Sequence, residues 1–229
     1  MNKVFLIILL LTALDLDLFG AQSLRKMRGV KKNFTVLLDP GHGGDFKGCP
    51  SFSGKYFEKD MTLDISLRVE KILKKNGVTV KLTRDKDINF SGDLELDLQR
   101  RVDMARLFGA NFLISIHLNS APNKAVRGFE LFIPELRFVS QSKEFADQLR
   151  LELLKNAKKD KKYDSRWDRG IKIAPFYLLK NAYCPSVLVE LEFITNPEGE
   201  KIISIPGKRQ QFAEIIAQTI IKYKKQNHK

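Results

Sequence analysis

Two of the three histidines in this chain stand where apolar runs end. His42 lies in residues 38–44 (LDPGHGG), and His117 lies in residues 114–120 (ISIHLNS). The third, His228, belongs to a lysine-rich tail. Open α/β sheets bind their ligands at the carboxyl ends of the strands. We therefore expect His42 and His117 to lie near one another at such an edge.

Two glutamates are placed to join these histidines. Glu58 opens a predicted helix, and Glu190 lies in a third apolar run, residues 185–191 (PSVLVEL). A hydrolytic zinc site uses three protein ligands and keeps a fourth position for water, so this residue set indicates a zinc hydrolase. Simpler explanations stay open: the helix dipole favours an acid at Glu58 in any case, and His117 could be an ordinary buried histidine.

The glycines around His42 have their own interpretation. Gly41, Gly43 and Gly44 let the backbone turn sharply and leave space for a ligand. A glycine-rich loop of this kind can also cradle phosphate. It lacks the GK[ST] ending of a P-loop and the full GxGxxG pattern, so nucleotide binding is disfavoured.

Alternating strands and helices must position these residues. Continuous apolar runs predict buried strands, and apolar residues at helical spacing predict amphipathic helices. The alternation predicts an α/β fold, a three-layer αβα sandwich with a mostly parallel central sheet, and the polar alternation of residues 127–133 favours an edge strand. Strands are expected at 34–38, 78–82, 112–116, 127–133 and 187–191, and helices at 59–75, 97–108, 141–158 and 209–225.

The N-terminus has the features of an export signal. Lys3 precedes an apolar run, residues 4–14, that is too short to span a bilayer comfortably. Cleavage after Ala21 is expected, but Phe19 fits the processing site poorly, so an uncleaved anchor stays open. The predicted organisation is a signal peptide at 1–21, a basic linker at 22–33, a catalytic domain at 34–225 and a tail at 226–229.

The net charge of +13 indicates an anionic partner, such as nucleic acid, anionic lipid or an acidic cell-wall polymer, unless it is only a solvated basic surface. The basic residues are scattered and a leader is present, which argues against nucleic acid. The basic run at 155–162 is expected to form a solvated loop. Cys49 and Cys184 are expected to be free thiols, neither of them a zinc ligand.

Eight segments, in this order, resemble the catalytic domain of the zinc-dependent N-acetylmuramoyl-L-alanine amidases of bacterial cell walls, the amidase type 3 family. The resemblance covers about residues 34–225 and rests on 38–44 (LDPGHGG), 58–60 (EKD), 82–85 (LTRD), Leu98 with Arg101, 115–120 (SIHLNS), 127–130 (RGFE), 169–172 (RGIK) and 185–196.

This resemblance implies that His42, Glu58 and His117 bind Zn²⁺ and that Glu190 is the catalytic carboxylate. The bond cut would join N-acetylmuramic acid to the L-alanine of the stem peptide in peptidoglycan, during cell-wall remodelling or daughter-cell separation. Arg84 and Asn119 are candidates for structural or substrate-positioning roles.

Two residues depart from the family pattern. Arg106 stands where family members tend to have asparagine, which concerns a local helix contact and not the chemistry. Glu192 stands where the family usually has glycine two positions after the catalytic glutamate. Residues 190 and 192 of a regular strand face the same side, so two carboxylates would share one neighbourhood if the strand continues that far. We expect Glu190 to be essential for hydrolysis and Glu192 only to modulate the activity.

The resemblance also sets expectations for the whole protein. We expect an exported monomer in the periplasm or cell envelope, without a membrane span in its mature form and without a nucleic-acid partner. The loops at 134–140 and 159–168 are too short for a helix that would block the zinc, so no built-in regulatory lid is expected. Two other classes stay open: a zinc exopeptidase, and a wall-binding protein that has lost its metal.

Overall fold

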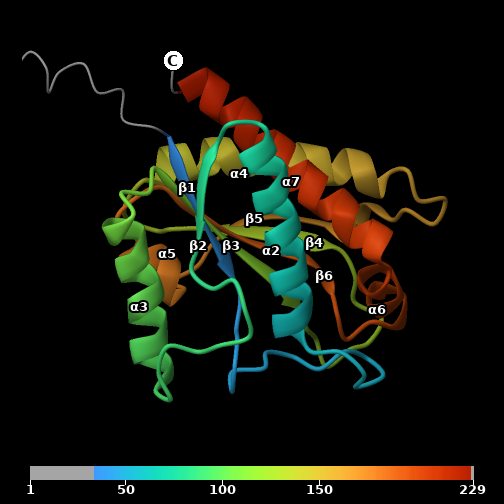
Figure 1. Ribbon diagram of the computed structural model, residues 1–229. Coiled ribbons are helices and arrows are strands. Elements are labelled where there is room, and N and C mark those ends of the chain that lie inside the picture. The colour runs from blue at the N-terminus through green and yellow to red at the C-terminus, as the bar shows by residue number, and fades with distance from the viewer. Residues whose placement is uncertain (1–33, 228–229) are drawn as a thin grey trace, which may run out of the picture. The chain divides into compact units, whose positions relative to one another are not determined.

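The structure is a computed structural model that describes residues 34–227 (Figure 1). The signal peptide or anchor predicted at 1–21 and the linker predicted at 22–33 lie outside the described residues, as does His228. Within residues 34–227, none of the helices is long and apolar enough to cross a membrane.

A six-stranded sheet forms the centre of the fold, with strand order β2-β1-β3-β6-β4-β5. Four of its five strand pairings are parallel, and β4 runs antiparallel to β6, so the sheet is mostly parallel, as expected. The strands are β1 Thr35–Pro40, β2 Thr79–Leu82, β3 Phe112–Asn119, β4 Phe129–Ile133, β5 Asp168–Ile173 and β6 Ser186–Phe193.

The order of the strands reverses between β1 and β3. From β1 the chain crosses to β2 on one side, and β3 then lies on the other side of β1. In open α/β sheets such a point leaves a crevice outside the carboxyl ends of the two strands. His42 follows β1 and His117 lies near the end of β3, so both histidines belong to this crevice.

Helices cover both faces of the sheet (Figure 1). The longest three, α2, α4 and α7, lie on one face together with α6, and the smaller pair α3 and α5 lies on the other. The helices are α2 Glu58–Lys75, α3 Leu94–Leu107, α4 Val139–Ala157, α5 Tyr177–Asn181, α6 Pro197–Ser204 and α7 Pro206–Asn227, with a 3-10 turn at Ser165–Trp167.

Alternation along the strands divides the core between the two faces. Val36, Leu38 and Ile114 pack in the large cluster with α2, α4 and α7, whereas Leu37 and Leu113 pack with Val102 of α3 and Leu178 of α5. Successive side chains of a strand point to opposite faces, and here both faces are apolar because both carry helices. The predicted three-layer αβα sandwich is confirmed.

The sequence placed the second half of the sheet less accurately. β4 was expected at an edge, but it lies between β6 and β5. The actual edge strand, β5, is short of apolar residues and was not predicted, nor were the short helices α5 and α6. The polar residue of β4, Glu130, is buried and has its own hydrogen-bond partners, so it does not mark an edge. The basic run at 155–162 is also divided, because Lys155–Ala157 completes α4.

Candidate metal centre

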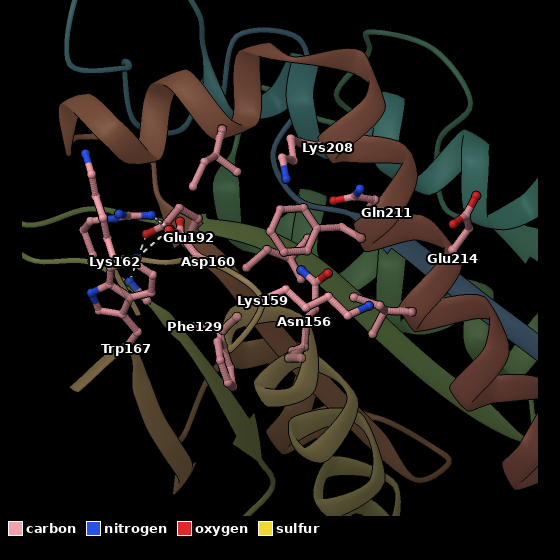
Figure 2. Close-up of a pocket in the computed structure, with 18 of the residues that line it drawn as sticks. Phe129, Asn156, Lys159, Asp160, Lys162, Trp167, Glu192, Lys208, Gln211 and Glu214 are labelled. Atoms are coloured by element: carbon pink, nitrogen blue, oxygen red, sulfur yellow. Dashed lines mark hydrogen bonds and ion pairs between the residues drawn. The ribbon is translucent and has the colours of Figure 1, made fainter. Parts of the chain in front are cut away.

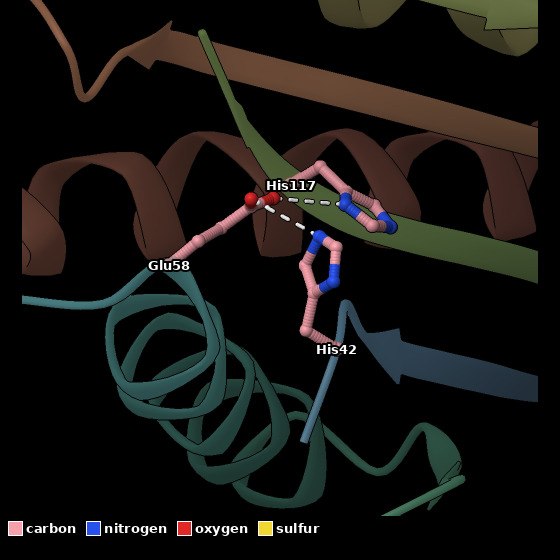
Figure 3. A group of neighbouring side chains, drawn as sticks. All are labelled: His42, Glu58 and His117. Atoms are coloured by element: carbon pink, nitrogen blue, oxygen red, sulfur yellow. Dashed lines mark hydrogen bonds and ion pairs between the residues drawn. The ribbon is translucent and has the colours of Figure 1, made fainter. Parts of the chain in front are cut away.

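Three predicted ligands meet at the crevice between β1 and β3 (Figure 3). Nε2 of His42 lies 3.0 Å from Oε2 of Glu58, and Nδ1 of His117 lies 2.9 Å from Oε1 of the same carboxylate. Their candidate ligand atoms all lie within 4.8 Å of one another. The structure thus brings together side chains from a loop, a helix and a strand that are up to 75 positions apart in the chain.

This arrangement fits a catalytic zinc ion in both chemistry and spacing. Two imidazoles and one carboxylate form a ligand set of hydrolytic zinc, with the fourth position left for water. A tetrahedral site with bonds of about 2.0–2.1 Å separates its ligand atoms by roughly 3.3 Å. The observed 2.9 and 3.0 Å separations need only a small expansion to reach that spacing.

Glu58 holds its two histidine neighbours through a fully satisfied carboxylate. The backbone N–H of Leu118 donates to Oε1 at 3.0 Å, and that of Cys49 donates to Oε2 at 3.1 Å. Burial alone would raise the pKa of Glu58, but His117 and His42 outweigh it and hold that pKa well below its usual range. Burial lowers the pKa of His117, yet the hydrogen bond and charge of Glu58 raise it to about 9.

The backbone near the site is strained and crowded. His42 has a φ of 64°, a left-handed conformation that is rare for residues other than glycine and that collects at functional sites. A Cβ added to Gly41 would meet the His117 ring at 2.4 Å. Gly48, with a φ of +67°, approaches both Glu58 and His42, and its added Cβ would lie 2.7 Å from Glu58 Oε2.

A buried ion pair fixes the end of β1. Asp39 accepts hydrogen bonds from Thr83 at 2.7 Å, from Ser115 at 2.6 Å and from Nη1 of Arg101 at 3.0 Å. Arg101 also donates to the carbonyl oxygen of His42 at 2.8 Å. Burial raises the pKa of Asp39, but Arg101 and the two hydroxyls outweigh it and keep that pKa below its usual value.

Arg84 completes this support. Its guanidinium donates to the carbonyl oxygens of Pro40, Gly41 and Lys59, at 3.1, 2.9 and 2.8 Å. The side chain is buried beneath the loop that carries His42. Of the two roles left open for Arg84, the contacts support the structural one, because its donors are directed at backbone oxygens. Arg84 follows β2 and supports the site by holding the backbone that leads to His42.

Glu190 faces His117 across the β3–β6 pair, in register with it. Its Oε2 is buried and accepts no hydrogen bond from residues 34–227. Burial raises the pKa of Glu190 to about 8; the charge of His117 opposes this shift, and Glu58 and Glu130 add to it. A carboxyl group with a pKa near neutrality can both accept and release a proton.

The sequence pattern did not predict a role for Glu130, although this residue lies in one of the resembling segments. Glu130 of β4 is directly opposite Glu190 of β6. Its carboxylate accepts from Asn119 and Lys172 and contacts Arg169 Nε at 3.3 Å. The available signal was an acid inside the apolar strand Phe129–Ile133, which needs partners when buried.

Glu192 lies elsewhere than predicted. Its carboxylate accepts from Arg127 at 3.0 Å and from the backbone N–H groups of Gly128 and Phe193, each at 2.9 Å. The register shifts between His117 and Asn119, where three steps along β6 match two steps along β3. This β-bulge breaks the alternation, so the neighbourhood that Glu192 was expected to share with Glu190 belongs to Glu130 instead.

The cysteines stay apart from the ligand set. Cys49 and Cys184 are both free thiols. Cys49 contributes its backbone N–H to Glu58, and its Sγ lies 2.9 Å from the Ser120 hydroxyl. Cys184 is buried at the far end of β6, where burial raises the pKa of its thiol to about 12.

The family of the chain follows from its similarity to known proteins. The sequence profile of the N-acetylmuramoyl-L-alanine amidase family matches residues 36–222. The chain belongs to this family. This amidase is 31% identical to N-acetylmuramoyl-L-alanine amidase AmiA of Escherichia coli (strain K12) over 82% of its own length and 75% of that protein.

Solved structures agree. N-acetylmuramoyl-L-alanine amidase AmiC2 of Nostoc punctiforme is similar with a TM-score of 0.71 and 35% identity, covering 84% of this chain and 97% of that one. The N-acetylmuramoyl-L-alanine amidase of Clostridium difficile 630 is similar with a TM-score of 0.75 and 30% identity, covering 85% and 98%. The fold and the enzyme class expected from the sequence are therefore confirmed for this amidase.

Proposed function

We propose that this chain is a zinc-dependent hydrolase of the amide bond between N-acetylmuramic acid and L-alanine in peptidoglycan. His42, Glu58 and His117 are the proposed zinc ligands, and Glu190 is the proposed catalytic carboxylate. The observation that carries the proposal is the His-Glu-His cluster at the strand-order reversal, with Glu190 in register beside His117. Membership of the amidase family gives the bond that is cut.

Each residue has a distinct task in this mechanism. When bound, zinc polarises the scissile carbonyl and lowers the pKa of a water molecule. Before the metal binds, Glu58 holds both imidazoles at the site, and Asp39 with Arg101 holds the loop that carries His42. Glu190 takes the proton of the attacking water at its unpartnered Oε2 and delivers it to the amine of L-alanine as that amine leaves.

Metal content and product analysis test the proposal together. The full chain is purified, its zinc is quantified, and purified sacculi are digested and analysed by mass spectrometry. We expect about one zinc per chain and products that carry a new N-terminal L-alanine. Glu190→Gln is expected to keep its zinc and lose hydrolysis by about a thousandfold or more.

Other products would separate the remaining classes. Release of single amino acids from peptide ends would indicate an exopeptidase. A chain that binds sacculi but contains no zinc and cuts nothing would be a non-catalytic wall-binding protein. Hydrolysis that persists after the metal has been removed would contradict the ligand assignment itself.

We also propose that the enzyme acts in the cell envelope, after export, as a monomer that needs no activator. The curated relatives include a probable cell wall amidase, LytH, of Staphylococcus epidermidis, and β4 joins α4 through a short connection at residues 134–138. A zymogram of the purified chain on embedded sacculi tests this. A clear band without any added partner is expected, and activity that appears only with an added activator would contradict it.

A further inference from the structure

A second cavity, of about 780 Å³, lies between α4, α7 and the segment at residues 158–167 (Figure 2). It lies on the face of the sheet that α2, α4 and α7 cover. Phe129 and Leu191 line it, whereas their chain neighbours Glu130 and Glu190 alternate to the opposite face of the sheet. Its volume is that of a small-molecule site, and it contains none of the proposed zinc ligands.

The floor of this cavity is apolar. Phe129, Leu153, Leu191 and Phe212 are buried there, and Ala157 and Ile215 line the wall from α4 and α7. Among the residues that line the cavity, the apolar side chains form the floor and the charged side chains form the rim. The floor suits a hydrocarbon chain, whose transfer from water stabilises binding by its apolar area.

The rim is basic. Lys159, Lys161, Lys162 and Lys208 stand around the opening, and all four are exposed. Two acids share the rim: Asp160 accepts from the backbone N–H of Lys162 at 2.9 Å, and Glu214 accepts from Gln210 at 3.1 Å. The remaining pair, Arg127 and Glu192, is an ion pair in which each charge is compensated. The donors to these two acids are neutral, so the rim carries four cations against two acids and is positive on balance.

We infer that this cavity binds an anionic lipid, with one acyl chain on the apolar floor and the anionic headgroup among the rim lysines. The chemistry of the two parts is complementary to the two parts of the cavity, and the net charge of +13 supports approach to an anionic membrane surface. The inference does not depend on the zinc site, since the two sites share no residue.

Trp167 makes the inference directly measurable. It is the only tryptophan of the chain, and its ring lies over the Arg127 guanidinium, 4.0 Å from the ring centroid, at the edge of the cavity. Its fluorescence therefore reports on this cavity alone. The probe is monomeric lysophosphatidylglycerol, added to the full chain below its critical micelle concentration. A saturable blue shift is expected.

Two kinds of variant separate headgroup from chain. Lys161→Glu with Lys162→Glu is expected to weaken binding about tenfold or more, because two headgroup contacts are reversed in charge. Ala157→Phe fills the wall and is expected to weaken binding similarly without a change in rim charge. The matched control, Lys71→Glu with Lys75→Glu, makes the same charge change on exposed lysines of α2 and is expected to bind as the wild type does.

Ligand controls complete the experiment. Glycerol 3-phosphate, which has the headgroup charge but no chain, and lysophosphatidylcholine, which has the chain but no net charge, are each expected to bind at least about tenfold more weakly. Equal binding of glycerol 3-phosphate would overturn the inference in favour of a simple anion site. Equal loss in the α2 control, or no loss in either cavity variant, would also overturn it.

Discussion

At the scale of single residues, the site depends on one carboxylate that accepts four hydrogen bonds. Glu58 receives the two histidine nitrogens and the backbone N–H groups of Leu118 and Cys49. This geometry requires the loop at Cys49 to pass very close to Glu58. Gly48 permits that approach, because it has no Cβ to collide with the carboxylate.

Gly48→Ala is expected to lower zinc affinity by about tenfold or more, since its Cβ would lie 2.7 Å from both Glu58 Oε2 and His42 Cδ2. Competition with a fluorescent chelator measures the affinity. Gly54→Ala is the matched control: its φ is +75°, but nothing lies within 4 Å of the added Cβ. Both variants carry the strain of a positive φ, about 1 kcal/mol, and only Gly48→Ala should lose zinc. An equal loss in both would assign the effect to strain alone.

The two nearby glutamates of β6 should respond in opposite ways to the same change. Glu192→Gln weakens a buried ion pair with Arg127, so we expect the free energy of unfolding to fall by about 2 kcal/mol while most hydrolytic activity remains. Glu190→Gln removes no ion pair and should lose activity without losing stability. Urea unfolding and muropeptide release measure the two properties. The reverse pattern would exchange the roles of the two residues.

At the scale of elements, Asp39 joins three parts of the fold. It lies near the end of β1, accepts from Ser115 of β3, and pairs with Arg101 of α3. Arg101 in turn pairs with Asp97, one turn earlier in the same helix, at 2.7 Å. The helix that covers the smaller face is thereby fixed to the strand that leads into the metal site.

This pair gives stability a defined pH dependence. The pKa of Asp39 is lower in the folded chain than in the unfolded one, so its contribution is present above the unfolded value of about 3.9 and is lost as the pH falls through the folded value. Asp39→Asn should therefore lower the free energy of unfolding by about 3 kcal/mol at pH 7, with a smaller difference from the wild type in acid.

Urea unfolding at pH 7, 5 and 3.5 measures this difference. Asp164→Asn serves as the control, because Asp164 forms a comparable pair with Arg166 on the surface, where water screens the charges. No measurable change is expected for that variant. A gap between Asp39→Asn and the wild type that stays constant down to pH 3.5 would contradict the assigned pKa direction.

At the scale of the whole molecule, the residues of the proposed metal site lie outside the apolar core. The large apolar cluster joins β1, β3, β4 and β6 to α2, α4 and α7 without any metal ligand among its members. Because Glu58 is satisfied by protein donors, the metal-free site leaves no buried charge of its own unpaired. Folding is therefore expected to be independent of the metal.

Removing the metal should abolish hydrolysis and preserve the fold. We expect the far-UV circular dichroism of the chelated chain to match that of the zinc-loaded chain. The melting temperature should rise with free zinc by mass action, because zinc at one hundred times its Kd adds about 2.7 kcal/mol to the free energy of unfolding. Re-addition of zinc should restore activity. Loss of helical signal on chelation would instead show that the metal is part of the folding unit.

The sequence determined much of this protein through local patterns. Apolar runs placed β1, β3 and β6, and helical spacing placed α2 and α7. Residues in or after the strands, and one at a helix start, gave the site candidates His42, His117, Glu190 and Glu58. These features depend on hydrogen bonding and side-chain periodicity within one segment, which the order of residues records directly.

Only the tertiary structure decided which carboxylates face one another. Glu130 meets Glu190 because β4 inserts antiparallel between β6 and β5, and Glu192 turns to Arg127 because a bulge interrupts β6. Strand pairing joins segments about sixty positions apart, and a bulge depends on the partner strand as much as on its own residues. The proposed ligands could be named from the sequence alone, but the side chains that surround them depended on how the strands pair in the sheet.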